Sequence, residues 1–248
     1  MKKILSLVLV VLMLAATLCA CGGTDTPTTT APKQNPTTAP TTTGGTPDPA
    51  GPVVINVSEY LANLDKWEID DDFGLKHENN KMSFLTTDPG ESMAAMLKVP
   101  AKNVTYKFNI TVDALGDGVV GADNWWDAEL MFLARASVAG PGWRDDGSQT
   151  GYSITSWGEM KSVCIGRSGK DDLAEFEWNI ADGNSHEIEF SVVSNDDDSV
   201  VTITLKVDGE VIGVVEDDGS AIKNDRPASY PEAGNLVIRA KWVGITIG

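Results

Sequence analysis

Two polar segments of the chain carry large aromatic residues beside hydrogen-bonding side chains. Trp125 and Trp126 precede Asp127, and Trp143 precedes Arg144, in stretches rich in glycine, aspartate and asparagine. A tryptophan ring can stack on the apolar C–H face of a sugar, while charged and amide groups pair with its hydroxyls. These segments therefore predict carbohydrate recognition, unless some of the tryptophans fold back to cap the core. Further contacts are expected from four residues of neighbouring strands, namely Arg135, Tyr152, Trp157 and Glu159.

The same region offers a catalytic alternative. A retaining glycosidase needs two carboxyl groups ~5 Å apart, and side chains at i and i+2 of a strand share one face. Asp127 and Glu129 meet this condition, and the apolar alternation from Ala128 to Ala134 would leave them on a polar face with Arg135. We prefer a polar sheet face to a catalytic pair, so the chain is expected to bind rather than to cleave.

Alternating strands must position these groups. Thr105–Asp113 alternates apolar and polar residues, which is typical of a half-buried strand. Further strands are expected at Asp127–Ala136, Gly151–Trp157, Ser162–Arg167, Ala174–Ile180, His186–Val193, Val200–Val207, Glu210–Val215 and Leu236–Ile247. Asp208-Gly209 is the strongest hairpin signal. The one expected helix is short, at Ser58–Leu64, with Ser58 as its cap. Many strands and almost no helix predict an all-β sandwich or jelly roll.

The second half of the domain resembles the concanavalin A-like lectin/glucanase superfamily. The resemblance rests on short motifs from about Tyr106 to the end of the chain: Met131–Arg135, Gly151–Ile154, Ser185–Val192, Val201–Gly209, Gly234–Ile238 and Trp242–Ile245. It implies a jelly-roll β-sandwich of two antiparallel sheets. The laminarinase-like enzymes of the superfamily carry a catalytic E-φ-D-φ-x-E strand, and Trp126–Met131 departs from that pattern. The fold also carries lectins, laminin-G-like modules and spacers, so the resemblance favours the fold over any one activity.

The N-terminus has the pattern of an export signal. Lys2 and Lys3 precede the apolar stretch Ile4–Leu18, which is shorter than the ~20 residues of a membrane-spanning helix. Leu18–Cys21 resembles the bacterial lipoprotein box, which implies acylation of Cys21 after removal of residues 1–20. The alternative is an ordinary secretory signal ending nearby. In both cases we expect an extracytoplasmic protein, and in the first a lipid-anchored one on the cell surface.

Composition divides the rest of the chain. Residues 21–52 are mostly Thr, Pro, Gly and Ala, which predicts a disordered tether that holds the domain away from the membrane. Residues 53–248 suit one domain, because all-β domains often reach ~200 residues. The formal charge is -17, and loss of Lys2 and Lys3 would leave 17 basic against 36 acidic residues. Such a field repels phosphate backbones and anionic headgroups. We therefore expect no nucleic-acid partner, and membrane contact through the lipid alone.

The remaining chemistry-bearing residues indicate structural roles. Cys164 has no intramolecular disulfide partner once Cys19 and Cys21 are assigned to the signal and the anchor, so a buried small hydrophobe is expected. His186 resembles the strand histidine of the superfamily and is expected to be structural. Trp67, Trp178 and Trp242 are assigned to the core. The acidic runs Asp70–Asp72, Asp171–Asp172, Asp196–Asp198 and Asp217–Asp218 are compatible with calcium, but solvated hairpin tips are preferred.

Together these observations predict a lipid-anchored surface protein whose jelly-roll domain binds a plant, host or cell-wall glycan without a cofactor. Two alternatives stay open. One is a glycoside hydrolase or lyase using Asp127 and Glu129, and the other is a protein-interaction or spacer module. Binding through exposed tryptophan and polar side chains in a shallow groove would give weak affinity at a single site.

Overall fold

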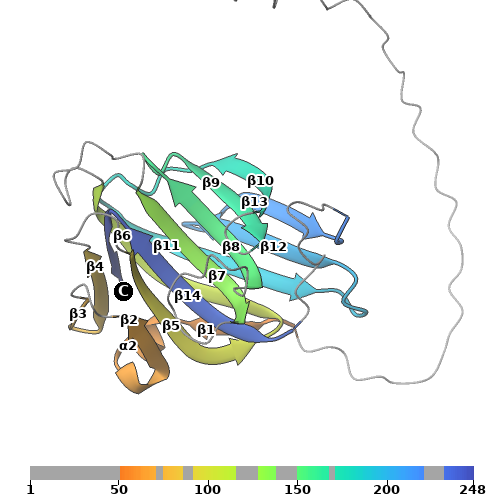
Figure 1. Cartoon of the computed structure of the whole chain (residues 1–248), viewed down its shortest axis with the longest axis horizontal. Coiled ribbons are helices and arrows are strands. Elements are labelled where there is room, and N and C mark those ends of the chain that lie inside the picture. Colours follow the sequence, from red (N-terminus) through yellow and green to blue (C-terminus); the bar gives the residue numbers. More distant parts are fainter. Residues whose placement is uncertain are drawn as a thin grey trace, which may run out of the picture. The chain divides into compact units, whose positions relative to one another are not determined.

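The computed structural model describes residues 51–70, 75–85, 92–115, 128–137, 150–167, 171–220 and 232–248. These belong to one compact unit, Asp48–Gly248. Figure 1 shows its two layers of strands, with one short helix at the edge. The helical elements of the described residues are α2 (Ser58–Leu61) and the 3-10 turn η1 (Leu64–Lys66).

One layer is an eight-stranded sheet within the described residues. Its order is β13 (Glu210–Asp217), β12 (Val201–Val207), β11 (Ser185–Ser194), β6 (Val104–Leu115), β15 (Val243–Ile247), β4 (Lys81–Leu85) and β3 (Lys76–Glu78). The eighth strand, β1 (Val53–Asn56), pairs with β6 in parallel. The other pairings of this sheet are antiparallel.

The second layer is a seven-stranded antiparallel sheet. Its order in the described residues is β10 (Asp171–Glu177), β9 (Ser162–Arg167), β8 (Thr150–Trp157), β7 (Glu129–Ser137), β14 (Gly234–Lys241), β5 (Ser92–Ala101) and β2 (Trp67–Asp70). The polypeptide passes from this sheet to the first at Trp242, where β14 ends and β15 begins. The two sheets therefore form a β-sandwich.

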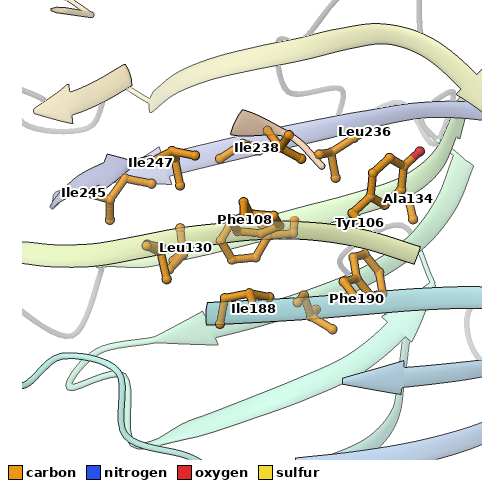
Figure 2. Packing of buried hydrophobic residues seen from close by; sticks show 14 of the residues in the cluster. Tyr106, Phe108, Leu130, Ala134, Ile188, Phe190, Leu236, Ile238, Ile245 and Ile247 are labelled. Atoms are coloured by element: carbon orange, nitrogen blue, oxygen red, sulfur yellow. The ribbon is translucent and has the colours of Figure 1, made fainter. Parts of the chain in front are cut away.

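The core lies between the sheets and follows the period-2 alternation of the strands. Figure 2 shows apolar side chains of both layers meeting between the strands, with Phe108 of β6 among Leu130 of β7 and Ile238 of β14. The rings of Phe108 and Phe132 lie 4.9 Å apart between centroids at an interplanar angle of 46°. Because these two residues come from opposite sheets, their contact ties the layers together, and such aromatic pairs contribute ~0.5–1.5 kcal/mol beyond the area they bury.

The strand predictions from Thr105 to Val215 are confirmed within the described residues. Ser162–Arg167 is reproduced residue for residue as β9, and the other expected strands shift by a few residues at their ends. The Asp208-Gly209 hairpin is also confirmed, because both residues have positive φ, 52° and 82°. A two-residue turn with both central φ values positive matches the twist of the strands it joins. Trp67, Trp178 and Trp242 are buried, and so is the side chain of Cys164, as predicted.

Two predictions about elements are wrong. Leu236–Ile247 is not one strand, because Trp242 takes a φ of 52° and turns the chain into the other sheet. The expected helix is confirmed only for its first turn, and Val57 rather than Ser58 occupies the cap position without a side-chain hydrogen bond. The strands before Thr105, β1 to β5, had no clear alternation in the sequence and were not predicted.

A buried ion pair joins the two sheets at one end of the sandwich. Arg167 of β9 donates from Nε to Asp217 Oδ2 of β13 at 2.9 Å, and its Nη2 bonds the other carboxylate oxygen. The side chains are 0% and 1% exposed. Tyr152 OH and the Gly219 amide also donate to Asp217, at 2.9 and 3.0 Å. The carboxylate is thus well satisfied, which a buried charge requires.

Among the described residues, the structure contains no helix long and apolar enough to cross a membrane.

Candidate functional site

A row of polar and aromatic side chains crosses the outer face of the seven-stranded sheet. Trp157 of β8 pairs with Glu129 of β7, and Glu129 pairs on its other side with Lys241 of β14. Residues directly opposite on neighbouring strands have Cβ atoms ~4.5–5.5 Å apart, so the three side chains form one short row. The inward alternation of Ala128 and Leu130 turns Glu129 outward, away from the core. We call these three residues the Trp157 row.

Arg239 supports this row from the next position along β14. Its Nη2 lies 3.4 Å from Glu129 Oε2, and the side chains of Arg239 and Glu129 are 6% and 15% exposed. The Lys241 ammonium lies 5.4 Å from the centroid of the Trp242 ring, a cation–π distance. Glu129 therefore has the Arg239 guanidinium beside it and, at 15% exposure, keeps part of its carboxylate at the surface. The row combines an apolar ring, an acceptor and charged donors.

The row lies at an open end of β7 and β8. Trp157 is 39% exposed, whereas Met131 and Thr155, one step further along the same strands, are 0% and 1% exposed. Thr155 Oγ1 is buried and has no hydrogen-bond partner among the described residues. A buried unsatisfied hydroxyl costs ~1–3 kcal/mol. The accessible surface on these strands is thus concentrated at the end that carries Trp157.

A tight turn fixes the position of Trp157. The Gly158 amide donates to Ala128 O at 2.9 Å, and the Met160 amide donates to Trp157 O at 3.1 Å. Met160 has a φ of 55° and a fully buried side chain, so it anchors the turn in the core. Trp157 is therefore held on two sides by backbone hydrogen bonds, which gives the rigid support that a binding residue needs.

Glu159 lies at the tip of the same turn. Its carboxylate pairs with Lys161, and their side chains are 51% and 72% exposed. The prediction that Trp157 and Glu159 present themselves to a ligand is compatible with these positions. An ion pair so exposed contributes little to stability, and it is free to exchange its partner for a ligand hydroxyl.

Arg135 does not reach the outer face, which corrects the sequence interpretation. It lies at an irregularity of β7 with a φ of 54°, and this bulge turns the side chain inward. Arg135 Nε donates to Lys102 O at 2.7 Å, and Nη2 donates to Ser194 Oγ at 3.0 Å. Glycines flank the bulge on both sides. A Cβ on Gly151 would lie 2.6 Å from Ala134 O, and one on Gly234 would lie 2.3 Å from the Arg135 carbonyl carbon.

Tyr152 is the second correction. It was expected to contribute to a glycan site from β8, but its side chain points into the core, it is fully buried, and its hydroxyl donates to Asp217. Its alternation with Ile154, which is also buried, explains the direction. The other expected contacts, Trp125, Trp126, Asp127, Trp143 and Arg144, lie outside the described residues. The catalytic alternative is therefore represented only by Glu129, held by Arg239.

Sequence reasoning missed Arg239 and Lys241. Both alternate with the buried Ile238 and Ala240, so their outward direction was readable from Leu236–Ile247. Their register against Glu129 was not readable, because β14 and β7 are far apart in the chain.

His186 is structural, as predicted, but its partners are carboxylates rather than core residues. Nδ1 lies 2.7 Å from Asp208 Oδ2, and Nε2 lies 2.9 Å from Asp182 Oδ1. Burial alone would lower the pKa of His186, but the hydrogen bonds to Asp208 and Asp182 outweigh it and raise that pKa. The pKa of Asp208 is lowered, first by its hydrogen bond to His186. The cluster fastens the Asp208-Gly209 hairpin to the start of β11.

The described acidic runs do not gather around a cation position. Asp217 is bonded to Arg167, Asp198 pairs with Lys102 at 2.5 Å, and Asp197 accepts from Ser199 Oγ at 2.6 Å. Across the described ranges, no group of three or more His, Cys, Asp or Glu side chains could hold a metal ion. These carboxylates serve hydrogen bonds and ion pairs within the protein.

Comparison with solved structures places the sandwich among lectin-like folds. A Bacillus subtilis protein with a galectin-like fold superposes with a TM-score of 0.55 at 9% identity, covering 75% of this chain and 88% of that one. The potassium-bound carbohydrate recognition domain of Emp46p gives 0.50 at 15% identity, covering 76% and 88%. The calcium-bound exoplasmic/lumenal domain of VIP36 gives 0.50 at 10% identity, covering 75% and 82%.

The fold class is therefore a lectin-like jelly-roll β-sandwich of the concanavalin A-like kind, as the sequence predicts. No family model matches the chain, and no curated protein matches it. At identities of 9 to 15% the likeness shows the fold alone. Function must be argued from the side chains of the site.

Proposed function

We propose that the domain binds a glycan on the outer face of the seven-stranded sheet, with the Trp157 row as the centre of the site. The observation that carries the proposal is an exposed tryptophan in register with a carboxylate that a buried arginine supports. A pyranose ring would stack its C–H face on the Trp157 indole. Its hydroxyls would donate to Glu129 and accept from Lys241.

The geometry favours binding over cleavage. Glu129 accepts a hydrogen bond from Arg239 Nη2, which holds its carboxylate in place as an acceptor for ligand hydroxyls. Glycoside hydrolysis in addition needs a second carboxyl group at ~5–9.5 Å, on the far side of the scissile bond. Within the described residues, Glu159 is the acidic side chain nearest in sequence to Trp157, and it pairs with Lys161 at the tip of the turn.

The fold is compatible with glycan binding, but it does not identify the binding residues. The Emp46p domain is a carbohydrate recognition domain, and this chain shares its sandwich at low identity. A domain of this kind can hold a metal, since the VIP36 form is calcium-bound. No step of the proposed recognition depends on a cation.

A glycan array and a polysaccharide pull-down test the proposal. The purified protein should bind one class of plant, host or cell-wall glycan, and Trp157→Ala should weaken that binding about tenfold, which corresponds to ~1.4 kcal/mol. Leu64→Ala is the matched control, because Leu64 is 40% exposed and Trp157 39%. Equal binding by wild type and Trp157→Ala would reject this site, and no binding to any glycan would favour an interaction or spacer module.

We further propose that Cys21 is acylated and anchors the protein to the outer side of a bacterial cell membrane, with residues 21–52 as the tether. The support is the signal-like N-terminus and its resemblance to the lipoprotein box. Metabolic labelling with a fatty acid analogue should mark the wild-type protein in the membrane fraction. Cys21→Ser should be unlabelled and should leave the membrane fraction; labelling of that variant would refute the assignment.

A further inference from the structure

A polar groove lies on the opposite side of the sandwich, on the outer face of the eight-stranded sheet. Its volume is about 210 Å³, and its walls are Thr105, Glu189, Ser191, Thr204 and Lys206. These residues come from three adjacent strands, β6, β11 and β12. All five are half-buried, so they line a recess in the surface instead of projecting into solvent. This groove has no part in the site of the Trp157 row.

The register of the strands builds the groove as two parallel rows. Ser191 pairs with Thr105 on one side and Thr204 on the other. Glu189 pairs in the same way with Lys107 and Lys206. Neighbouring strands lie ~4.8 Å apart, so a hydroxyl row and a charged row run side by side across the sheet. Groups placed on paired strands hold their positions more closely than groups on loops.

Hydrogen bonds within the hydroxyl row leave defined groups for a ligand. Ser191 Oγ lies 2.9 Å from Thr105 Oγ1, where either hydroxyl can be the donor, and 3.3 Å from Val104 O, to which it can donate. Each of these two hydroxyl oxygens has a second lone pair, so the linked pair can still accept from a ligand. The Thr204 hydroxyl makes no side-chain hydrogen bond to the described residues and offers both a donor and an acceptor.

The charged row is balanced. Lys107 Nζ lies 2.7 Å from Glu189 Oε1, whereas Lys206 Nζ lies 3.5 Å from Glu189 Oε2. The hydrogen bond from Lys107 lowers the pKa of Glu189, so the carboxylate is ionised at neutral pH. Glu187, the next outward residue of β11, also acts on Lys107. Two lysines thus face two glutamates. Lys206, the more loosely held lysine, keeps donors for a ligand.

Apolar surface borders the hydroxyl row at both ends. Val54 of β1 pairs with Thr105, and Val214 of β13 pairs with Thr204. Their side chains are 54% and 52% exposed. The row therefore reads apolar, hydroxyl, hydroxyl, hydroxyl, apolar. A sugar residue combines hydroxyl groups with C–H faces in the same way.

From this arrangement we propose a second binding site, which takes a single neutral sugar residue. A neutral ligand fits because the local charges cancel and the chain as a whole carries a formal charge of -17, which repels anions. A single residue fits because the groove is smaller than the ~300 Å³ at which pockets for drug-sized ligands begin. With sites on opposite faces, one domain would bridge two glycan chains, and the paired contacts would add avidity to two weak affinities.

NMR titration with glucose, galactose, mannose and N-acetylglucosamine tests the second site. In a Trp157→Ala protein, at least one of these sugars should cause saturable shifts at the amide resonances of Ser191, Thr204 and Lys206. Thr204→Val, which keeps the shape and the strand preference, should weaken that response severalfold, and adding Lys206→Met should abolish it. Thr202→Val is the matched control, because it places the same substitution on β12 outside the groove walls, and it should leave the response in place.

The outcomes separate this site from the Trp157 row. Saturable shifts that survive Trp157→Ala and disappear in Thr204→Val with Lys206→Met support the second site, whatever the first one does. Shifts confined to Trp157 and Glu129 in the wild type would leave the proposed function standing and overturn the second site. Absence of saturable shifts at the groove with all four sugars would overturn it as well.

Discussion

Two arginine–carboxylate pairs stand on opposite sides of the same sheet, and they differ in how completely the protein satisfies them. Arg167 and Asp217 lie between the sheets, are 0% and 1% exposed, and share their carboxylate with Tyr152 and a backbone amide. Arg239 and Glu129 lie on the outer face, meet at 3.4 Å, and leave Glu129 15% exposed. The hydrogen bonds of the interior pair join the two sheets. The Glu129 carboxylate of the outer pair remains partly accessible to a ligand.

The largest expected effect comes from breaking the interior pair. Asp217→Asn keeps the shape of the side chain but removes the buried negative charge that faces Arg167 Nε and Nη2. We expect a loss of ~3–5 kcal/mol in the free energy of unfolding. Urea denaturation followed by circular dichroism measures it. A loss below about 1 kcal/mol in the free energy of unfolding would show that the interior pair contributes little to holding the two sheets together.

Trp157→Ala is expected to act on binding and to leave stability nearly unchanged. Loss of stacking should reduce glycan affinity about tenfold, since aromatic contacts of this kind contribute ~0.5–1.5 kcal/mol beyond their buried area. Because Trp157 is 39% exposed, unfolding should shift by roughly 0.5 kcal/mol or less. Calorimetric titration and urea denaturation of the same sample compare the two. A large loss of stability with unchanged glycan affinity would show that Trp157 serves the fold and not the binding site.

Glu129→Gln sharpens the comparison between the two carboxylates. The amide keeps one acceptor and loses the charge, so glycan affinity should fall severalfold, corresponding to ~1 kcal/mol. Its effect on unfolding should be smaller than that of Asp217→Asn, because Glu129 retains contact with solvent. Urea denaturation of Glu129→Gln and Asp217→Asn under the same conditions compares their losses in the free energy of unfolding. Complete loss of a glycan-cleaving activity in Glu129→Gln would instead establish the catalytic alternative.

The smallest expected effect concerns the exposed cluster of His186, Asp182 and Asp208. Because the folded pKa of His186 is raised, its contribution to stability is full below the unfolded value of ~6.5 and is lost as pH rises through the folded pKa. The lowered pKa values of Asp182 and Asp208 give a contribution that is present above ~3.9 and lost as pH falls. The cluster therefore stabilises most between these limits.

Unfolding free energies of wild type and His186→Gln, measured on both sides of pH ~6.5, test this dependence. The difference between the two proteins should be larger on the acidic side. An equal difference at both pH values would mean that His186 acts through packing rather than through charge.

Local sequence rules predicted the elements of the second half well and those of the first half poorly. Alternation in Thr105–Asp113 and the positive-φ pair Asp208-Gly209 are local signals, and the structure confirms both. Strands β1 and β3 are short and mostly exposed, so they lack the apolar half of the pattern. Trp242 divides the expected strand Leu236–Ile247 by adopting a φ of 52°, which is rare for a tryptophan and cannot be predicted from alternation.

Side-chain direction was predictable where alternation was unbroken and failed at the bulge. Glu129 points outward as its neighbours require, but Arg135, three alternations later, is turned inward. The signal lies in other strands, where Gly151 and Gly234 make room for the bulge. Arg239 could be assigned to an outer face, but its contact with Glu129 depends on register between distant strands. Trp157 is exposed, and its contribution to carbohydrate binding stays a prediction.

The most direct test of the account is a crystal structure of the protein with the glycan that the array identifies. We expect a pyranose ring stacked on the Trp157 indole, with hydroxyl groups hydrogen-bonded to Glu129 and Lys241. A ring bound elsewhere, with the Trp157 row in contact with solvent alone, would refute the proposed binding site.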